Sequence, residues 1–326
     1  MRCPIIILLL ILLVGQTYAQ RIEGLINQPD TSFTNYSAYK SAKKKYSDII
    51  LVKDSLPPPV KVERNLSYPN LDKQPLPIDA FYPKKHSKKK LPAIIIIHGG
   101  GWRSGNRTQH YPLAERLAEN GFVCFTPAYR LSTEALFPAA VQDLKSAISW
   151  VRTNANRFNI DTNKIAVLGF SAGGQLAALL GTTANNSIFT NGDKDFNKYA
   201  VQAIVDIDGI LAFIHPESGE GDDSKTISAA TNWFGYNKKD EPNLYEMASA
   251  LSYVGSHTPP TLFVNSSVDR MHAGRNDFVA ELNKFGIYNE VHTFPDTPHT
   301  FCLFEPWFTP TVNYVTVFLN KVFVSK

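Results

Sequence analysis

Cysteine is scarce in this chain, and its scarcity excludes a disulfide-bonded scaffold. Three of the 326 residues are cysteines, and Cys124 and Cys302 stand among apolar neighbours, a setting typical of buried thiols. Metal-ligand spacings are lacking as well. Asp193 and Asp195 begin the pattern of a calcium loop, but the other ligand positions of such a loop are not filled. We therefore expect no metal and no cofactor.

A strong charge of either sign is also missing. The formal net charge is +4, which is too small to indicate a nucleic-acid partner. The lysine-rich run at 84–90 is interpreted as a solvated hairpin loop between two strands, with a weak attraction to acidic polysaccharide as the alternative. Apolar residues make up 44% of the chain and charged residues 19%, which is typical of one large globular domain. We expect this domain at 61–326, after an N-terminal arm at 20–60.

The longest unbroken apolar run near the start, at 5–14, is too short to span a membrane. Arg2 precedes it, and the small-residue segment at 17–19 resembles a cleavage site. We expect residues 1–19 to be a signal peptide that is cut after Ala19, leaving no stable membrane anchor. An uncleaved N-terminal anchor is the alternative. Cleavage predicts a secreted or periplasmic protein.

Strand and helix patterns alternate through most of the chain. Two alternating stretches at 60–66 and 76–82 predict an antiparallel hairpin. Downstream, the sequence predicts strands at 93–97, 122–128, 164–168 and 201–207, with helices at 108–120, 138–156 and 173–182 between them. Such alternation predicts an α/β fold with a mostly parallel central sheet and helices on both faces. Residues 209–258 interrupt the alternation and are predicted to form a small cap-like insertion.

One short motif carries the strongest chemical signal. A predicted strand runs directly into Gly169-Phe170-Ser171-Ala172-Gly173, and a predicted helix follows. A Gly-x-Ser-x-Gly between a buried strand and a helix is the nucleophile elbow of the α/β-hydrolases, in which the serine sits on a strained turn. The glycines are required because side chains there would clash with the adjacent backbone. We expect Ser171 to be a nucleophile.

A second motif supplies the groups that stabilise negative charge. The strand at 93–97 leads into His98-Gly99-Gly100-Gly101-Trp102. Glycines at a strand end expose backbone N–H groups, which acyl transfer needs to hold the oxyanion of its tetrahedral intermediate. The expected donors are Gly100, Gly101 and Ala172. His98 precedes the glycines and is interpreted as a structural residue.

The acid and the base should follow the serine in the order Ser, Asp, His. A strand at 261–265 is followed by a loop that carries Asp269, and a strand at 288–294 by a loop that carries His299. Both loops follow the carboxyl ends of predicted parallel strands, where open α/β sheets bind ligands. The predicted triad is Ser171, Asp269 and His299. Asp206 and Asp208, one strand earlier, remain the alternatives for the acid.

Aromatic residues near these loops are candidate substrate contacts. Trp102 follows the glycines, Trp233 lies in the insertion and Trp307 lies just past the expected base. Aromatic side chains in such places suit stacking against sugar rings, and they equally suit a satellite hydrophobic cluster. Both interpretations stay open for Trp233 and Trp307.

The motifs resemble those of a known family. HGGGW at 98–102, GFSAGG at 169–174 and TPHTF at 297–301 resemble the α/β-hydrolase esterases related to hormone-sensitive lipase. With FPAAVQD at 137–143, the chain more narrowly resembles secreted bacterial carbohydrate esterases that remove acetyl groups from plant polysaccharides. The resemblance spans about 78–323 and implies acetylated xylan or pectin fragments as substrates. The loop after Asp269 lacks the proline that many relatives carry.

These observations predict a secreted serine esterase that hydrolyses short-chain, acetyl esters through an acyl-enzyme. Other hydrolases on the same fold remain alternatives: a general carboxylesterase or lipase, an arylformamidase or a peptidase. The absence of a long apolar lid counts against a lipase. A protein of a different class, which would use the cleft for binding without catalysis, should lack a triad residue, and none is missing. A structural or interaction protein has only the aromatic clusters in its favour.

Overall fold

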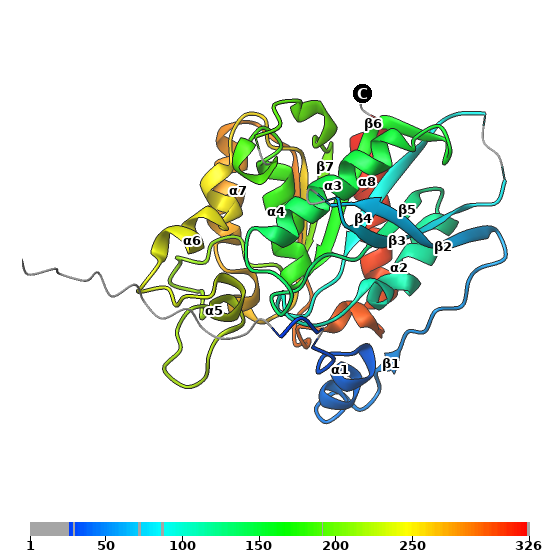
Figure 1. The fold of residues 1–326 in the computed structure, drawn as a ribbon. Coiled ribbons are helices and arrows are strands. Elements are labelled where there is room, and N and C mark those ends of the chain that lie inside the picture. The colour runs from blue at the N-terminus through cyan, green and yellow to red at the C-terminus, as the bar shows by residue number, and fades with distance from the viewer. Residues whose placement is uncertain (1–25, 29, 71–72, 86–87, 191, 325–326) are drawn as a thin grey trace, which may run out of the picture.

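The computed structural model describes residues 26–28, 30–70, 73–85, 88–190 and 192–324. The expected signal peptide at 1–19 lies outside the described residues. An eight-stranded sheet forms the centre of the molecule (Figure 1). In spatial order its strands are β2 (Val60–Pro69), β3 (Pro75–Pro83), β5 (Val123–Pro127), β4 (Leu91–Ile97), β6 (Ile160–Phe170), β7 (Ala203–Ile207), β8 (Thr261–Asn265) and β9 (Asn289–Thr293).

The strand pairing agrees with the sequence pattern. β2 pairs with β3, and β3 with β5, in antiparallel fashion, so the predicted opening hairpin is confirmed. From β5 through β4, β6, β7 and β8 to β9, every neighbouring pair is parallel. Parallel strands need crossover connections, and helices provide them. The predicted mostly parallel sheet is therefore present.

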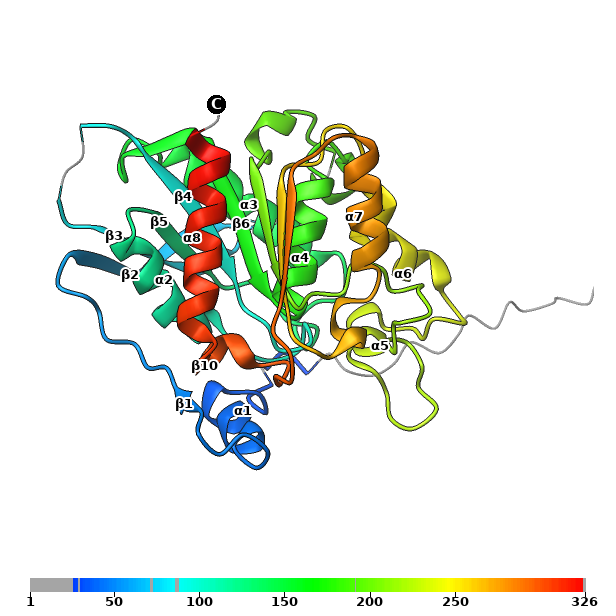
Figure 2. The same cartoon turned by 180° about the vertical axis from the view of Figure 1, so that it is seen from behind.

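Helices cover both faces of this sheet. α3 (Ala139–Thr153), α4 (Ala172–Thr182) and α7 (Arg275–Lys284) lie on one face, whereas α2 (Tyr111–Glu119) and α8 (Phe308–Val324) lie on the other (Figures 1 and 2). β4 shows why both faces are apolar, because its alternate side chains enter different cores. Ile95 and Ile97 pack with the first set of helices, and Ile94 and Ile96 with the second.

Two segments outside this framework reach the carboxyl ends of the strands. The arm contains α1 (Asn35–Ala42) and β1 (Ile50–Leu51), which pairs with β10 (Phe304–Glu305). Thr34 and Ser37 cap α1 reciprocally. Between β7 and β8 the chain forms α5 (Ala229–Phe234), α6 (Pro242–Met247) and the 3-10 turn η4 (Ala250–Tyr253). In Figure 1, α1 and α5 lie below the sheet at the same end of the molecule.

Cys124 and Cys302 are buried free thiols, as the sequence predicts. Across the described ranges, the helices are too short or too polar to cross a membrane. The remaining 3-10 turns are η1 (Arg107–His110), η2 (Ser187–Thr190), η3 (Phe196–Lys198), η5 (Asp269–His272) and η6 (Phe301–Leu303).

Candidate active site

Ser171 stands in a strained turn between β6 and α4. Its backbone angles are φ 58° and ψ −122°, which a residue with a side chain adopts only where the surrounding structure enforces them. The two flanking glycines enforce the turn by close packing. A Cβ on Gly169 would lie 1.9 Å from the carbonyl oxygen of Gly173, and a Cβ on Gly173 would lie 2.2 Å from that of Ile97. The predicted nucleophile elbow is therefore formed.

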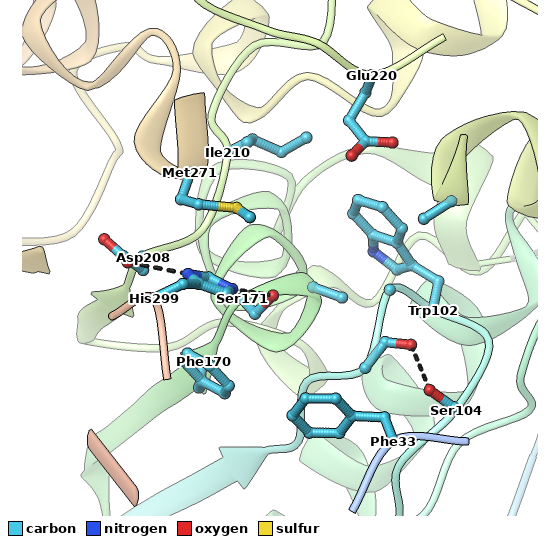
Figure 3. Close-up of a pocket in the computed structure, with 14 residues that line it drawn as sticks. Phe33, Trp102, Ser104, Phe170, Ser171, Asp208, Ile210, Glu220, Met271 and His299 are labelled. Carbon is cyan, nitrogen blue, oxygen red and sulfur yellow. Dashed lines mark hydrogen bonds and ion pairs between the residues drawn. The ribbon is translucent and has the colours of Figure 1, made fainter. Parts of the chain in front are cut away.

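His299 is hydrogen-bonded on both sides of its ring. Its Nε2 lies 2.8 Å from the Ser171 hydroxyl oxygen, and its Nδ1 lies 2.9 Å from Oδ2 of Asp208 (Figure 3). The residue comes from the loop between β9 and η6, where the sequence predicts the base. In this arrangement Nδ1–H donates to the carboxylate, so Nε2 is left to accept the serine proton.

The carboxylate that contacts His299 belongs to Asp208, the residue that follows β7. Its side chain is fully buried, and its Oδ1 accepts a 2.8 Å hydrogen bond from the backbone N–H of Ser266 at the end of β8. Its φ of 51° turns the chain sharply after the strand. Backbone geometry and the neighbouring strand therefore fix the carboxylate in place.

The prediction that Asp269 contacts the base is wrong. Asp269 begins η5, its side chain is 90% exposed, and its carboxylate lies 3.9 Å from Nε2 of His272. The turn directs a different side chain inward, because Met271 lines the cavity beside Ser171. The carboxylate thus comes from the strand next to the nucleophile strand, which sequence reasoning treated as one strand too early.

Asp206, the other alternative for the acid, stabilises the backbone near it and does not contact His299. It is fully buried, and its Oδ1 accepts a 2.7 Å bond from the backbone N–H of Gly209. Burial raises the pKa of Asp206 well above its usual range, and the neighbouring Asp208 charge adds to this effect. Asp206 therefore supports the turn that carries Asp208.

The predicted oxyanion donors surround the nucleophile. Gly100, Gly101 and Ala172 all line the cavity with Ser171. Gly100 and Gly101 have φ values of 127° and 61°, which only glycine adopts without strain. Within the described part of the chain, their backbone N–H groups and that of Ala172 have no acceptor. Such unpaired donors beside a nucleophile suit a developing oxyanion.

The glycine loop is held from behind by buried polar groups. The side chain of Gln109 accepts a 2.7 Å bond from the N–H of Gly99. The ring of His98 stacks on Tyr129 with 4.3 Å between ring centroids, and burial lowers the pKa of His98 to about 4. His98 is therefore neutral at pH 7. It is a structural residue of the glycine loop, as the sequence indicates.

A mostly apolar cavity of about 280 Å³ opens over Ser171 (Figure 3). Several parts of the chain build its walls: Phe33 comes from the arm, Phe170 from the end of β6, Met271 from η5, and Ile210 and Glu220 from the segment between β7 and β8. Glu220 is half-buried, and its Oε2 accepts a 3.0 Å bond from the N–H of Ala230. The cavity therefore combines an apolar lining with two carboxylates, Asp208 and Glu220.

The three predicted tryptophan contacts differ in position. Trp102 lines the cavity, and its indole N–H donates to Gln175 over 2.9 Å. Trp233 is fully buried and stacks behind Trp102 at 4.8 Å, so it supports the wall without facing the cavity. Trp307 packs edge-on against Tyr46 at 5.6 Å, away from the cavity. The expectation of direct contact fails for Trp233 and Trp307, because both belong to hydrophobic clusters.

The chain is similar in sequence to two esterases of Mycobacterium tuberculosis. The chain is 29% identical to "Esterase LipC" of Mycobacterium tuberculosis, over 76% of its own length and 63% of the relative's. It is 31% identical to "Esterase LipQ" of the same species, over 66% of its own length and 51% of the relative's. The chain thus spans half to two thirds of the length of these relatives.

The fold is also similar to that of a solved structure. An acetyl ester-xyloside bifunctional hydrolase from Caldicellulosiruptor lactoaceticus superposes with a TM-score of 0.64 at 26% identity, covering 79% of this chain and 97% of that one. The model of the BD-FAE family matches residues 78–274, which contain the glycine loop, Ser171 and Asp208. The chain belongs to the BD-FAE family and has the α/β-hydrolase fold of the esterases related to hormone-sensitive lipase.

Proposed function

We propose that this protein is a serine esterase that hydrolyses short-chain, acetyl esters of plant cell-wall polysaccharides or oligosaccharides. The observation that carries the proposal is the continuous pair of hydrogen bonds from Asp208 through His299 to Ser171, at the floor of a cavity. The sequence similarity to two mycobacterial esterases supports carboxylic ester hydrolysis. The similarity to an acetyl ester-xyloside hydrolase supports an acetylated sugar as substrate.

The mechanism begins with attack by the serine. As Oγ of Ser171 attacks the ester carbonyl carbon, Nε2 of His299 takes the hydroxyl proton. Asp208 accepts the hydrogen bond from Nδ1 and stabilises the imidazolium that forms. The carbonyl oxygen becomes an oxyanion, which the N–H groups of Gly100, Gly101 and Ala172 stabilise by about 3 kcal/mol each.

The tetrahedral intermediate then collapses. The ester C–O bond breaks, His299 passes its proton to the leaving alcohol, and an acyl group remains on Ser171. A water molecule attacks this acyl-enzyme with His299 as general base, which releases the carboxylic acid and restores the serine. Each step uses the same two nitrogen atoms of His299, so the orientation set by Asp208 matters throughout.

The walls of the cavity support a small acyl group. Bulky side chains of Trp102, Ile210 and Met271 surround the nucleophile, and the total volume of about 280 Å³ must also admit part of the alcohol. Hydrolysis rates with 4-nitrophenyl acetate, butyrate and octanoate test this point, with Ser171→Ala as the inactive control. A preference for octanoate would contradict the acetyl ester proposal, and activity retained by Ser171→Ala would contradict the mechanism.

We also propose that the protein is secreted or periplasmic. Removal of residues 1–19 as a signal peptide would deliver the enzyme to the periplasm or the medium, where polysaccharide fragments are available. Mass spectrometry of the mature N-terminus in a bacterial host that exports proteins tests this expectation. An exported chain should begin at Gln20, and a chain that retains Met1 and stays in the cytosol would contradict it.

A further inference from the structure

A second concave surface adjoins the catalytic cavity on the side of the N-terminal arm. This groove has a volume of about 540 Å³ and lies between the start of α1, the segment 51–54 at the end of β1, Arg64 of β2 and the segment 105–112. Phe33 lines both the cavity and the groove. Ser104 lines the cavity, and the next residue, Gly105, lines the groove. A substrate bound at Ser171 therefore has a direct route across Phe33 into the groove.

Arg64 presents a fixed positive charge in this groove. Its guanidinium carbon lies 4.4 Å from the centre of the Tyr111 ring, and the Tyr111 hydroxyl donates in turn to the buried Asp79. Stacking on a ring that is itself held in place orients the guanidinium plane. Among the described residues, no carboxylate lies within ion-pair distance of Arg64 and no acceptor takes a hydrogen bond from it, and the buried Glu115 acts on its charge at longer range. Its five N–H donors are therefore available to a ligand.

Other groove residues suit a polar ring compound. Lys53 adds a second exposed cation, and Asp54 is the one carboxylate among the described lining residues. Tyr36 is 62% exposed and lines the groove. Its ring stacks against Tyr39 at 6.4 Å, and Nζ of Lys40 lies 5.8 Å from the ring centre, so Tyr36 offers a hydroxyl group and the exposed part of its ring. Aromatic side chains with a polar tip bind partners that are apolar on one face and hydroxylated at the edge, as sugar rings are.

The signs of the charges differ between the two neighbouring spaces. The catalytic cavity contains the carboxylates of Asp208 and Glu220, and no Lys or Arg is among the described residues that line it. Glu220 lies across the cavity from Phe33 in Figure 3. An anionic substituent is therefore repelled from the cavity and attracted toward Arg64 and Lys53.

We propose that the groove binds the alcohol part of the ester and that Arg64 recognises a carboxylate on it, as in an acetylated chain of uronic acids. This inference rests on the proposed esterase function. The acetyl group would enter the cavity, and the adjoining sugar units would cross Phe33 toward Tyr36 and Arg64. A guanidinium binds a carboxylate through two parallel hydrogen bonds, which fixes the direction of the chain.

Kinetics with matched charged and neutral substrates test the groove. The measured quantity is the ratio of kcat/KM for an acetylated oligogalacturonide to that for an acetylated xylo-oligosaccharide of equal length. Arg64→Gln should lower this ratio about tenfold, mainly through KM, because a charge-assisted hydrogen bond is lost. Lys44→Gln removes an exposed positive charge outside the groove and serves as the matched control. An equal loss on both substrates, or no change in the ratio, would overturn the proposal.

Two additional measurements separate failure of the groove from failure of the esterase function. The wild-type ratio should fall as ionic strength rises from about 0.01 M to about 1 M, since the Debye length shrinks from about 30 Å to about 3 Å. Calorimetry with trigalacturonic acid, which has no ester, should show binding that Arg64→Gln abolishes. If the chain hydrolyses no ester but binds this acid through Arg64, only the esterase proposal fails. If it hydrolyses acetyl esters but Arg64→Gln binds the acid as the wild type does, only the groove proposal fails.

Discussion

Asp208 and His299 are 91 positions apart in the chain, yet Oδ2 of the one lies 2.9 Å from Nδ1 of the other. Asp208 follows β7, whereas His299 follows β9, so β8 lies between the two strands in the sheet. The end of β8 bridges the gap, because Ser266 donates its backbone N–H to the same carboxylate. The ends of two neighbouring strands, β7 and β8, therefore position the Asp208 carboxylate for its hydrogen bond with His299.

Substitution of the acid tests this assignment. Asp208→Asn keeps the shape of the side chain but allows the amide to favour the wrong tautomer of His299. We expect kcat on 4-nitrophenyl acetate to fall roughly 10³-fold to 10⁴-fold. The measurement is steady-state kinetics at pH 7, with circular dichroism to check that the variant is folded.

Asp269→Asn is the matched control for that substitution. The Asp269 side chain is 90% exposed and does not contact His299, so kcat should stay within about twofold of wild type. If Asp269→Asn abolished activity while Asp208→Asn retained it, the assignment of the acid from the structure would be refuted.

The sequence predicted the elements of this fold better than the exact partner of the histidine. The glycine loop and the serine elbow are local motifs, since each is defined by neighbouring residues and by the steric demands of one turn. His299 was found from its place after the last strand. These three features of the candidate site were therefore predictable without the structure.

The acid was missed because its position depends on three-dimensional geometry that spacing does not encode. Asp208 and Asp269 both follow buried parallel strands, and both strand ends lie near the nucleophile. Two local features decide which carboxylate contacts His299. The φ of 51° turns the chain at Asp208, and η5 leaves Asp269 in solvent. Asp208-Gly209 at a strand end was the available signal, since such a pair favours a sharp turn. The burial of Trp233 against Trp102 was likewise visible only in the packing.

The elbow glycines provide a stability prediction. Gly169→Ala would place a Cβ 1.9 Å from a backbone oxygen that cannot move without unfolding the start of α4. We expect the free energy of unfolding to fall by at least about 3 kcal/mol, as measured by urea denaturation. Gly219→Ala is the control, since nothing lies within 4 Å of the added Cβ. Equal stability of the two variants would contradict the close packing of the elbow.

Phe33 should limit the size of the substrate. The arm is attached to the glycine loop through the 3.0 Å ion pair between Asp30 and Arg103, so Phe33 has a defined place in the cavity wall. Phe33→Ala should raise the ratio of kcat/KM for 4-nitrophenyl octanoate to that for the acetate about fivefold, since removing a phenyl ring relieves a steric barrier worth about 1 kcal/mol.

Ile26→Ala alters the same arm outside the cavity and should leave that ratio unchanged. Ile26 is 57% exposed and is not among the residues of the cavity wall. An identical ratio in Phe33→Ala and Ile26→Ala would mean that the arm does not restrict the acyl group.

Because Lys145 is buried, we expect the free energy of unfolding to depend on pH in an unusual way. Its side chain is buried on α3, its Nζ donates to the carbonyl oxygen of Thr183 over 2.6 Å, and burial lowers the pKa of Lys145 to about 7. The unfolded chain holds this proton up to a pKa of about 10.4. As the pH falls from the unfolded pKa toward the folded pKa, the unfolded state therefore binds more protons and the native state loses stability.

Lys145→Met removes this penalty while keeping a side chain of similar length. The gain in the free energy of unfolding over wild type should increase by about 1.4 kcal/mol for each pH unit between about pH 9 and about pH 7, and level off below that range. Urea denaturation of both proteins across this range measures the difference. Lys164→Met is the control, because Lys164 is at a more exposed position in β6. Its difference in unfolding free energy from wild type should not change with pH in this range. A constant difference between Lys145→Met and wild type would mean that Lys145 keeps its ordinary pKa in the folded protein.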